Sequence, residues 1–424
     1  MSQLRYWIWL TTVPGLSLSA QRALIDTFES PEAVFLGDED ALRQTEGLSG
    51  SGLQALLRRD LRQADQVLED CRNEGISILT IQDAAYPQRL QAIENPPLVL
   101  YYKGTMLPFD TLPAVAVVGS RKASGYGLAT AKRMGFQIGA CGGIVVSGAA
   151  RGIDSLALEG ALSAGAPVAA VLGNGLDIVY PYEAKNLYAD VVEHGCLISE
   201  YVPGTKPLGS NFPRRNRIMS GLSLGVLVVE AAKKSGSLIT ADLALEQGRD
   251  VFAVPGNVGL DCCEGSNQLL QEGAMLATCG WDVLRGYQSR FPDRLRRREV
   301  GRALSLSPQD RKYIHNPETE KAPAEAERTR SETAAVQAKP VLNSEKRIDN
   351  TEKRNYIDLQ QAKQSLTEDE LVLVEVLRQG QRHVDDIIAE SGLPPARVLS
   401  SLTLMEVKGY VTQQPGKRFD LNLK

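Results

Sequence analysis

The chain is 424 residues long, which is more than one hydrophobic core can organise, so we expect two or three domains. Its net charge of −4 excludes a protein drawn to nucleic acid by its overall field, and any such binding needs a local basic patch. The cysteines have neither zinc-knuckle spacing nor the framework of a secreted disulfide scaffold, and we expect them to be buried and reduced.

The N-terminal segment lacks the basic start, the apolar run and the small cleavage residues of a signal peptide. No apolar stretch reaches the roughly 20 residues that a membrane helix needs. We therefore expect a soluble, cytoplasmic protein.

Residues 1–80 have the apolar periodicity of helices and predict a small helical N-terminal domain. Gly-Leu turns begin at Gly15 and Gly47, each before an apolar run. The pair resembles degraded helix-hairpin-helix motifs in a SAM-like or helix-hairpin-helix-like domain, and intact hairpins point backbone N–H groups at DNA phosphates. Plain packing of helices joined by turns explains the pattern equally well. Residues 81–113, rich in proline and tyrosine, are predicted to be a connector.

Residues 114–288 alternate short β-branched runs with helical stretches. The predicted strands are 115–119, 144–148, 168–173, 197–200, 226–230 and 251–255. Nearly continuous apolar strands are typical of a parallel sheet that helices cover on both faces. The right-handed crossover rule then predicts an α/β fold with a Rossmann-like doubly wound sheet, which binds ligands beyond the C-terminal strand ends.

Residues 289–365 are charged and poor in aromatic side chains, and we expect a disordered linker there. Residues 366–424 regain a fold. Three helices and a hairpin are predicted, in this order, at 371–377, 384–391, 395–408 and 410–417. This order is that of a winged-helix domain. Its basic residues are dispersed, which favours a protein-contact role over the reading of DNA.

The first predicted strand runs into Gly119, Ser120 and Arg121. Gly119 allows a tight turn, Ser120 and the N–H groups beyond it face the crevice, and Arg121 supplies a guanidinium fork that suits phosphate oxygens. The Gly-x-Gly-x-x-Gly fingerprint is missing, and no acidic residue ends the second strand to hold a ribose. We therefore expect no dinucleotide cofactor.

Two further strands also end in glycine-rich turns. The second provides Gly148, Arg151 and Gly152, and the third provides Gly173 and Asn174. One such turn is explained by turn chemistry, but three at one rim indicate an anion groove lined by backbone. Asp154 is expected to cap the helix that follows the second turn.

The densest basic segment lies at the start of a predicted helix. It contains Asn211, Phe212, Arg214, Arg215, Asn216 and Arg217, with no acidic residue among them. Like charges this close repel one another unless a polyanion is present. We expect about half of these arginines to face a ligand and the others to pair with Glu200 or Glu230. Phe212 offers a face on which a base can stack.

The last motif lies where the strand ending at Glu230 meets a helix. Lys233, Gly236, Ser237 and Thr240 supply an ammonium, free N–H groups and hydroxyls there. This arrangement is typical of a phosphate bound at a helix N-terminus.

Catalytic groups are not evident. His194, His315 and His383 fall where none can pair with a nucleophile in the crevice. The sequence has no metal-ligand cluster, no Walker lysine loop and no plausible carboxylate dyad, so we expect a binding protein with no catalytic residue and no metal.

Two other classes stay open. A nucleotide-processing phosphoribohydrolase-like enzyme has a related fold, but its Pro-Gly-Gly-x-Gly-Thr stretch has its nearest match at 254–257, without the glycine run or the threonine. A winged-helix transcription regulator with a nucleotide-sensing central domain would explain the C-terminal region.

Five motifs in order, at 119–121, 147–154, 175–181, 212–217 and 230–240, resemble the DNA-processing protein A family (DprA/Smf). The resemblance implies sequence-independent binding of single-stranded DNA, a homodimer formed through the Rossmann-like domain, and loading of the RecA recombinase during natural transformation, that is, competence, DNA uptake and DNA recombination. Its DNA-contacting positions would be 120–121, 148–152, 173–174, 211–217 and 233–240. The family usually has histidine where this chain has Leu158, which argues against a catalytic role there. The long charged linker before the winged-helix domain is a second departure from the pattern of that family.

Overall fold

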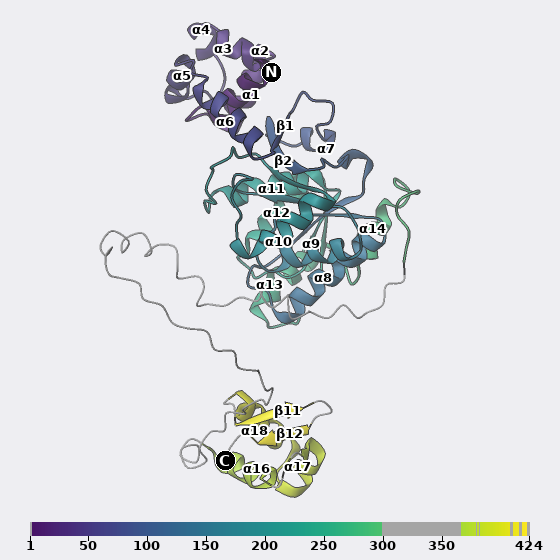
Figure 1. Ribbon diagram of the computed structural model, residues 1–424. Helices are drawn as coiled ribbons and strands as arrows, with labels where there is room; N and C mark the ends of the chain where they lie inside the picture. Colours follow the sequence, from purple (N-terminus) through teal and green to yellow (C-terminus); the bar gives the residue numbers. More distant parts are fainter. Residues whose placement is uncertain are drawn as a thin grey trace, which may run out of the picture. The chain divides into compact units, whose positions relative to one another are not determined.

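The structure, a computed structural model, describes residues 2–298 and 366–421 apart from 379, 381, 408–409 and 415–417 (Figure 1). The chain divides into two compact units, residues 1–330 and 331–424, and each is described by itself. The predicted linker at 289–365 lies outside the described residues from position 299 onward, as does the predicted wing turn at 415–417.

The N-terminal region is helical, as predicted. Its helices are α1 (Ser2–Thr12), α2 (Leu18–Phe28), α3 (Pro31–Leu36), α4 (Glu39–Arg43), α5 (Gly50–Leu57) and α6 (Arg62–Asn73). Gly15 and Gly47 both have positive φ, at +80° and +73°. The Ser49 hydroxyl donates to the Gly15 carbonyl at 3.4 Å, so the two Gly-Leu turns lie side by side.

The central sheet has nine strands within the described part of the chain. They are β1 (Ser77–Thr80), β2 (Val99–Gly104), β3 (Ala114–Val118), β4 (Ile144–Ser147), β5 (Val168–Leu172), β6 (Cys196–Ser199), β7 (Gly225–Val228), β8 (Asp250–Ala253) and β9 (Met275–Leu276). Their order in the sheet is β1-β2-β6-β5-β4-β3-β7-β8-β9. The predicted strands correspond to β3–β8, and all of them run parallel.

The segment predicted as a connector differs from the expectation. Residues 99–104 form β2, which pairs antiparallel with β6 on one side and with β1 on the other. Val99, Leu100 and Tyr101 are buried there. An irregular segment that contains two prolines precedes this strand. Val99 and Leu100 then pair with β1, and residues 101–104 pair with β6.

The order of strands makes the sheet doubly wound. From β3 the chain adds β4, β5 and β6 on one side, then returns to add β7, β8 and β9 on the other. The topological switch point therefore lies between β3 and β7, where ligands bind in folds of this kind. The helices that accompany the central sheet are α7 (Gln88–Gln91), α8 (Gly125–Ala140), α9 (Ile153–Ser163), α10 (Lys185–His194), α11 (Asn211–Leu222), α12 (Gly236–Glu246), α13 (Glu264–Gln271) and α14 (Gly280–Leu284).

Helices α8 and α9 pack closely because glycines lie at their contact. A Cβ at Gly160 would overlap the Lys132 carbonyl, which is backbone and cannot swing away. Gly160→Ala should therefore destabilise the fold by about 1–3 kcal/mol through overpacking, although alanine favours helices. The urea midpoint measures this loss. Gly50→Ala in α5, where a Cβ would meet nothing within 4 Å, is the matched control and should be neutral or stabilising. Equal midpoints for the two variants would contradict the prediction.

The C-terminal unit has the predicted winged-helix order. Helices α16 (Glu368–Leu377), α17 (Val384–Ser391) and α18 (Pro395–Val407) accompany a three-stranded sheet. Strand β12 (Arg418–Leu421) lies between β10 (Arg382–His383) and β11 (Val411–Gln414) and is antiparallel to both. The C-terminal unit has a hydrophobic core of its own, which includes Leu373, Ile387 and Phe419. Among the described residues, no helix is long and apolar enough to cross a membrane.

Candidate nucleic-acid interface

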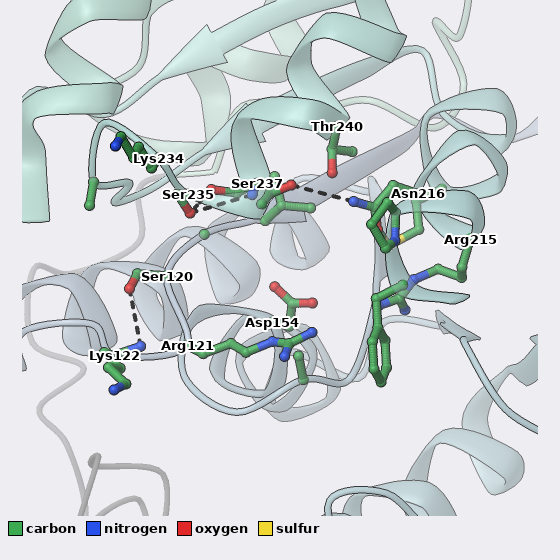
Figure 2. A pocket seen from close by; sticks show the side chains of 18 of the residues that line it. Ser120, Arg121, Lys122, Asp154, Arg215, Asn216, Lys234, Ser235, Ser237 and Thr240 are labelled. Atoms are coloured by element: carbon green, nitrogen blue, oxygen red, sulfur yellow. Dashed lines mark hydrogen bonds between the residues drawn. The ribbon is translucent and has the colours of Figure 1, made fainter. Parts of the chain in front are cut away.

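A cavity of about 770 Å³ opens at the C-terminal ends of β3 and β7, the switch point of the sheet. Its walls come from the loop after β3, the first turns of α9 and α11, and the loop into α12 (Figure 2). The cavity therefore joins segments that are far apart in the sequence at the edge where the fold predicts a ligand.

The loop after β3 is held by backbone contacts. The Ser120 N–H donates to the Glu230 carbonyl at 2.7 Å, and the Ser120 hydroxyl accepts from the Lys122 N–H at 3.0 Å. Arg121 is exposed, and its guanidinium carbon lies 4.8 Å from the centre of the Phe212 ring. A guanidinium stacked on a ring keeps its N–H groups free at the edge, where phosphate oxygens can accept from them.

An aromatic surface adjoins Arg121. The rings of Phe212 and Tyr180 lie 5.7 Å apart at an angle of 32°, and both residues line the cavity. Tyr180 is 42% exposed, which is unusual for a large side chain beside a packed ring. Faces of this kind stack on nucleic-acid bases of any sequence. The sequence pattern indicated Phe212 but not Tyr180.

The arginines of α11 divide between two roles. Arg214 and Arg217 both pair with Glu200, at 3.2 and 2.6 Å, and the side chains of Arg217 and Glu200 are buried. Arg215 lines the cavity but is only 3% exposed, and its Nη1 donates to the Val171 carbonyl. The expectation that some of these arginines pair with Glu200 agrees with this geometry.

Glu200, and not Glu230, is the carboxylate that the α11 arginines pair with within the described part of the chain, and Glu230 has other partners. Its carboxylate accepts from the Ser124 N–H at 3.0 Å and from the Ser124 hydroxyl at 2.7 Å. Ser124 in turn caps α8. Glu230 therefore ties the end of β7 to the start of α8, and its charge lies near the positive end of that helix.

Asp154 is a cavity residue that the sequence pattern did not identify. It was expected to cap α9, but Gly152 holds the cap position and Asp154 lies in the first turn. Its carboxylate accepts from the Gly148 N–H at 3.1 Å and lines the cavity (Figure 2). Burial raises the pKa of Asp154, while the charges of Arg215 and Arg121 oppose that rise. Burial also lowers the pKa of Arg215.

The glycines of the second and third turns make room for protein groups. A Cβ at Gly148 would overlap the Arg215 guanidinium, and one at Gly152, where φ is +83°, would overlap the Ser120 carbonyl. At Gly173 a Cβ would lie 2.9 Å from the Phe212 ring. These glycines therefore position Ser120, Phe212 and Arg215, and they are not themselves among the residues that line the cavity.

The polar side chains of these turns also have protein partners. Arg151 pairs with Glu183 at 2.7 Å. Asn174 is buried, and its amide donates to the Ile178 carbonyl at 2.8 Å. Asn211 begins α11, and its amide donates to the Gly173 carbonyl at 3.0 Å. The predicted backbone-lined rim is thus largely an internal scaffold.

The N-terminus of α12 faces the cavity. Gly236, Ser237 and Thr240 all line it, and the Asn216 amide donates to the Gly236 carbonyl at 3.4 Å. The Thr240 hydroxyl is buried and has no hydrogen-bond partner among the described residues. A buried polar atom without a partner is costly, so this hydroxyl favours a polar ligand. Lys233 borders a neighbouring hollow instead, while Lys234 lines the main cavity.

The fold and the site agree with a known family. The DNA recombination-mediator protein A family matches residues 77–288, and the DprA winged helix domain matches residues 358–417. The chain belongs to the DNA recombination-mediator protein A family. The family match begins at β1, so the antiparallel strands β1 and β2 belong to the domain that defines DprA proteins.

Curated relatives named Smf and DprA match this chain over different lengths. Protein Smf of Synechocystis sp. PCC 6803 is 29% identical over 422 residues, which are 99% of this chain and 98% of that protein. DNA processing protein DprA of Streptococcus pneumoniae is 44% identical over 211 residues, 49% of this chain and 73% of the relative. The X-ray structure of DprA from Streptococcus pneumoniae superposes with a TM-score of 0.59 at 36% identity, covering 66% of this chain and 97% of that one. The resemblance drawn from the motifs is confirmed.

Proposed function

We propose that this protein binds single-stranded DNA without sequence preference in the cavity at the C-terminal end of its sheet. The observation that carries the proposal is the Arg121 guanidinium stacked on Phe212 at the mouth of that cavity. Phosphates would lie between Arg121 and the N-terminus of α12, and bases would stack on Phe212 and Tyr180. Such binding requires no bond to be broken.

The aromatic faces favour a single strand over a duplex. The bases of a duplex stack on one another and leave no face for Phe212 or Tyr180, whereas unpaired bases are free to stack on protein rings. Arg121 and Lys234 add positive charge at the cavity, in a chain whose net charge is −4. The phosphate contacts are therefore local, and affinity should fall steeply with salt as counterions are released.

A titration of labelled oligonucleotides tests this proposal. Single strands of unrelated sequence should bind alike and far more tightly than the corresponding duplexes. Release of a base from a nucleoside monophosphate, with no binding of oligonucleotides, would replace the proposal with the phosphoribohydrolase alternative. Asp154 and Asp261 are the carboxyl groups that line this cavity among the described residues, and such an activity would draw on them.

We further propose that the bound strand is passed to the recombinase RecA in the cytoplasm during natural transformation. The family's description as a recombination mediator supports this role. The rate at which RecA assembles on single-stranded DNA should rise when the protein is present, and a variant that does not bind DNA should lose the effect.

A homodimer formed through the Rossmann-like domain is supported by the edge strand β9. This strand ends the sheet, and its apolar side chains Met275 and Leu276 are 44% and 53% exposed. An unpaired edge with apolar side chains is suited to pairing with a second copy. Leu276→Lys should therefore shift the molar mass measured by light scattering from dimer to monomer. Leu36→Lys, at a leucine on α3 that is 65% exposed, is the control and should leave the mass unchanged.

A further inference from the structure

Two adjacent cysteines lie beside a carboxylate at the edge of the cavity. Cys262 and Cys263 belong to the short helical turn η3 (Asp261–Cys263), and Glu230 follows β7. One ligand atom from each of these residues falls within 4.8 Å of the other two. The sequence pattern did not indicate this group, because the cysteines are adjacent and Glu230 is more than thirty residues away.

The backbone holds the three residues in place. The N–H groups of Gly265 and Ser266 donate to the Ala231 carbonyl at 2.8 and 3.3 Å, which fixes the cysteine turn next to the end of β7. A Cβ at Gly256 would overlap the Cys263 sulfur, so the glycine leaves room for the thiol. Cys263 is buried, whereas Cys262 is partly exposed and lines the cavity, which gives an ion a path of entry.

The separation of the sulfurs fits a tetrahedral metal ion. The two Sγ atoms are 3.8 Å apart. Two sulfurs that each lie about 2.3 Å from a tetrahedral zinc ion are separated by about 3.8 Å. We propose that Cys262, Cys263 and Glu230 bind a thiophilic divalent cation, with Zn²⁺ as the best-fitting ion and water in the fourth position.

Two other roles for the pair fit less well. Adjacent Cα atoms are about 3.8 Å apart, which is shorter than the roughly 4.4–6.8 Å of ordinary disulfides. The carboxylate of Glu230 lies within 4.8 Å of the Cys262 sulfur and disfavours a negative charge there, so the free thiol is a poor nucleophile. A bound cation makes the thiolate favourable, because thiols that coordinate zinc lose their protons. The Glu230 carboxylate then stabilises the positive charge of the ion.

Metal analysis of the full chain tests the proposal. After treatment with a chelator, incubation with Zn²⁺ and removal of free metal, the wild type should retain about one zinc ion per chain. Cys262→Ser should retain less than a tenth of that amount. Cys279→Ser is the matched control: Cys279 lies outside the group, and serine keeps the helix-capping role of its side chain. Failure of the wild type to retain zinc, or equal loss in both variants, would overturn the proposal.

A second readout separates metal binding from folding. Co²⁺ in place of Zn²⁺ should produce thiolate-to-metal charge-transfer absorption in the wild type and in Cys279→Ser, but not in Cys262→Ser. Zinc should also raise the thermal midpoint of the wild type, since a ligand that binds the folded state stabilises it. Wild type whose midpoint and spectrum do not respond to either ion contradicts the proposal. No DNA is present in these measurements, so their outcome is independent of the oligonucleotide titration.

Discussion

Replacing Arg121 with alanine should weaken the binding of every single-stranded oligonucleotide about tenfold or more, whatever its sequence. Its guanidinium is exposed at the cavity and stacked on Phe212, so it is available for a charge-assisted hydrogen bond to phosphate. Such bonds contribute about 1.5–3 kcal/mol, and about 1.4 kcal/mol corresponds to a factor of ten in affinity. Fluorescence anisotropy with oligonucleotides of different sequence measures the loss.

The dependence on salt makes this prediction specific. Each phosphate contact to a single strand contributes about 0.7 to the slope of log affinity against log salt, so Arg121→Ala should make that slope shallower by about 0.7. Arg22→Ala is the control, because it removes one positive charge from an exposed pair with Asp26 on α2, away from the cavity. If both variants lose the same affinity, the effect comes from net charge and Arg121 makes no specific contact.

Replacing Arg215 with alanine should destabilise the fold by about 3–5 kcal/mol, the usual loss when one partner of a buried charge pair is removed. Arg215 and Asp154 are both buried, and the charge of each counteracts the effect of burial on the other's pKa. Removal of the guanidinium also leaves the Val171 carbonyl without this donor and opens a space beside Gly148. The midpoint of urea unfolding, followed by circular dichroism, measures the loss.

The double variant Arg215→Ala with Asp154→Asn tests whether the unpaired buried charge of Asp154 causes this loss of stability. Asparagine still accepts the hydrogen bond from the Gly148 N–H but carries no charge, so the double variant should recover part of the stability lost by Arg215→Ala. If Asp154→Asn brings no recovery in the Arg215→Ala background, the buried charge is not the cause.

The division of labour among the α11 arginines shows where local reasoning ends. Positions 214 and 217 are three residues apart, so their side chains lie on one face of a helix, and both pair with Glu200. Position 215 lies about 100° around the helix from position 214, and its side chain therefore faces the cavity side of the domain. Helical geometry alone predicts this grouping. It does not predict which face meets Glu200, because that residue follows β6 and reaches α11 only when the sheet is complete.

The strand β2 illustrates a similar limit in the fold. The strands of the parallel sheet could be predicted because each is a nearly continuous apolar run between helices, and a run buried on both faces has few alternatives. Residues 99–102 are also apolar, but they follow a proline-rich segment and lack a helix on either side of the kind that marks a parallel strand. Their antiparallel pairing with β6 depends on a strand nearly one hundred residues further along the chain.

The sequence by itself determined the order of the strands β3–β8 and their helices, the parallel sheet, the edge of that sheet at which folds of this kind bind ligands, and the concentration of cations and glycines at that edge. Hydrophobic periodicity and turn chemistry are local, so they can be read residue by residue. Only the tertiary structure decided which of those groups remain available to a ligand. Arg151, Arg214 and Arg217 have carboxylate partners, whereas Arg121 stacks on Phe212 with its guanidinium exposed. These partners come from distant strands and loops, and a charge is free or neutralised according to what the completed fold brings within a few ångströms of it.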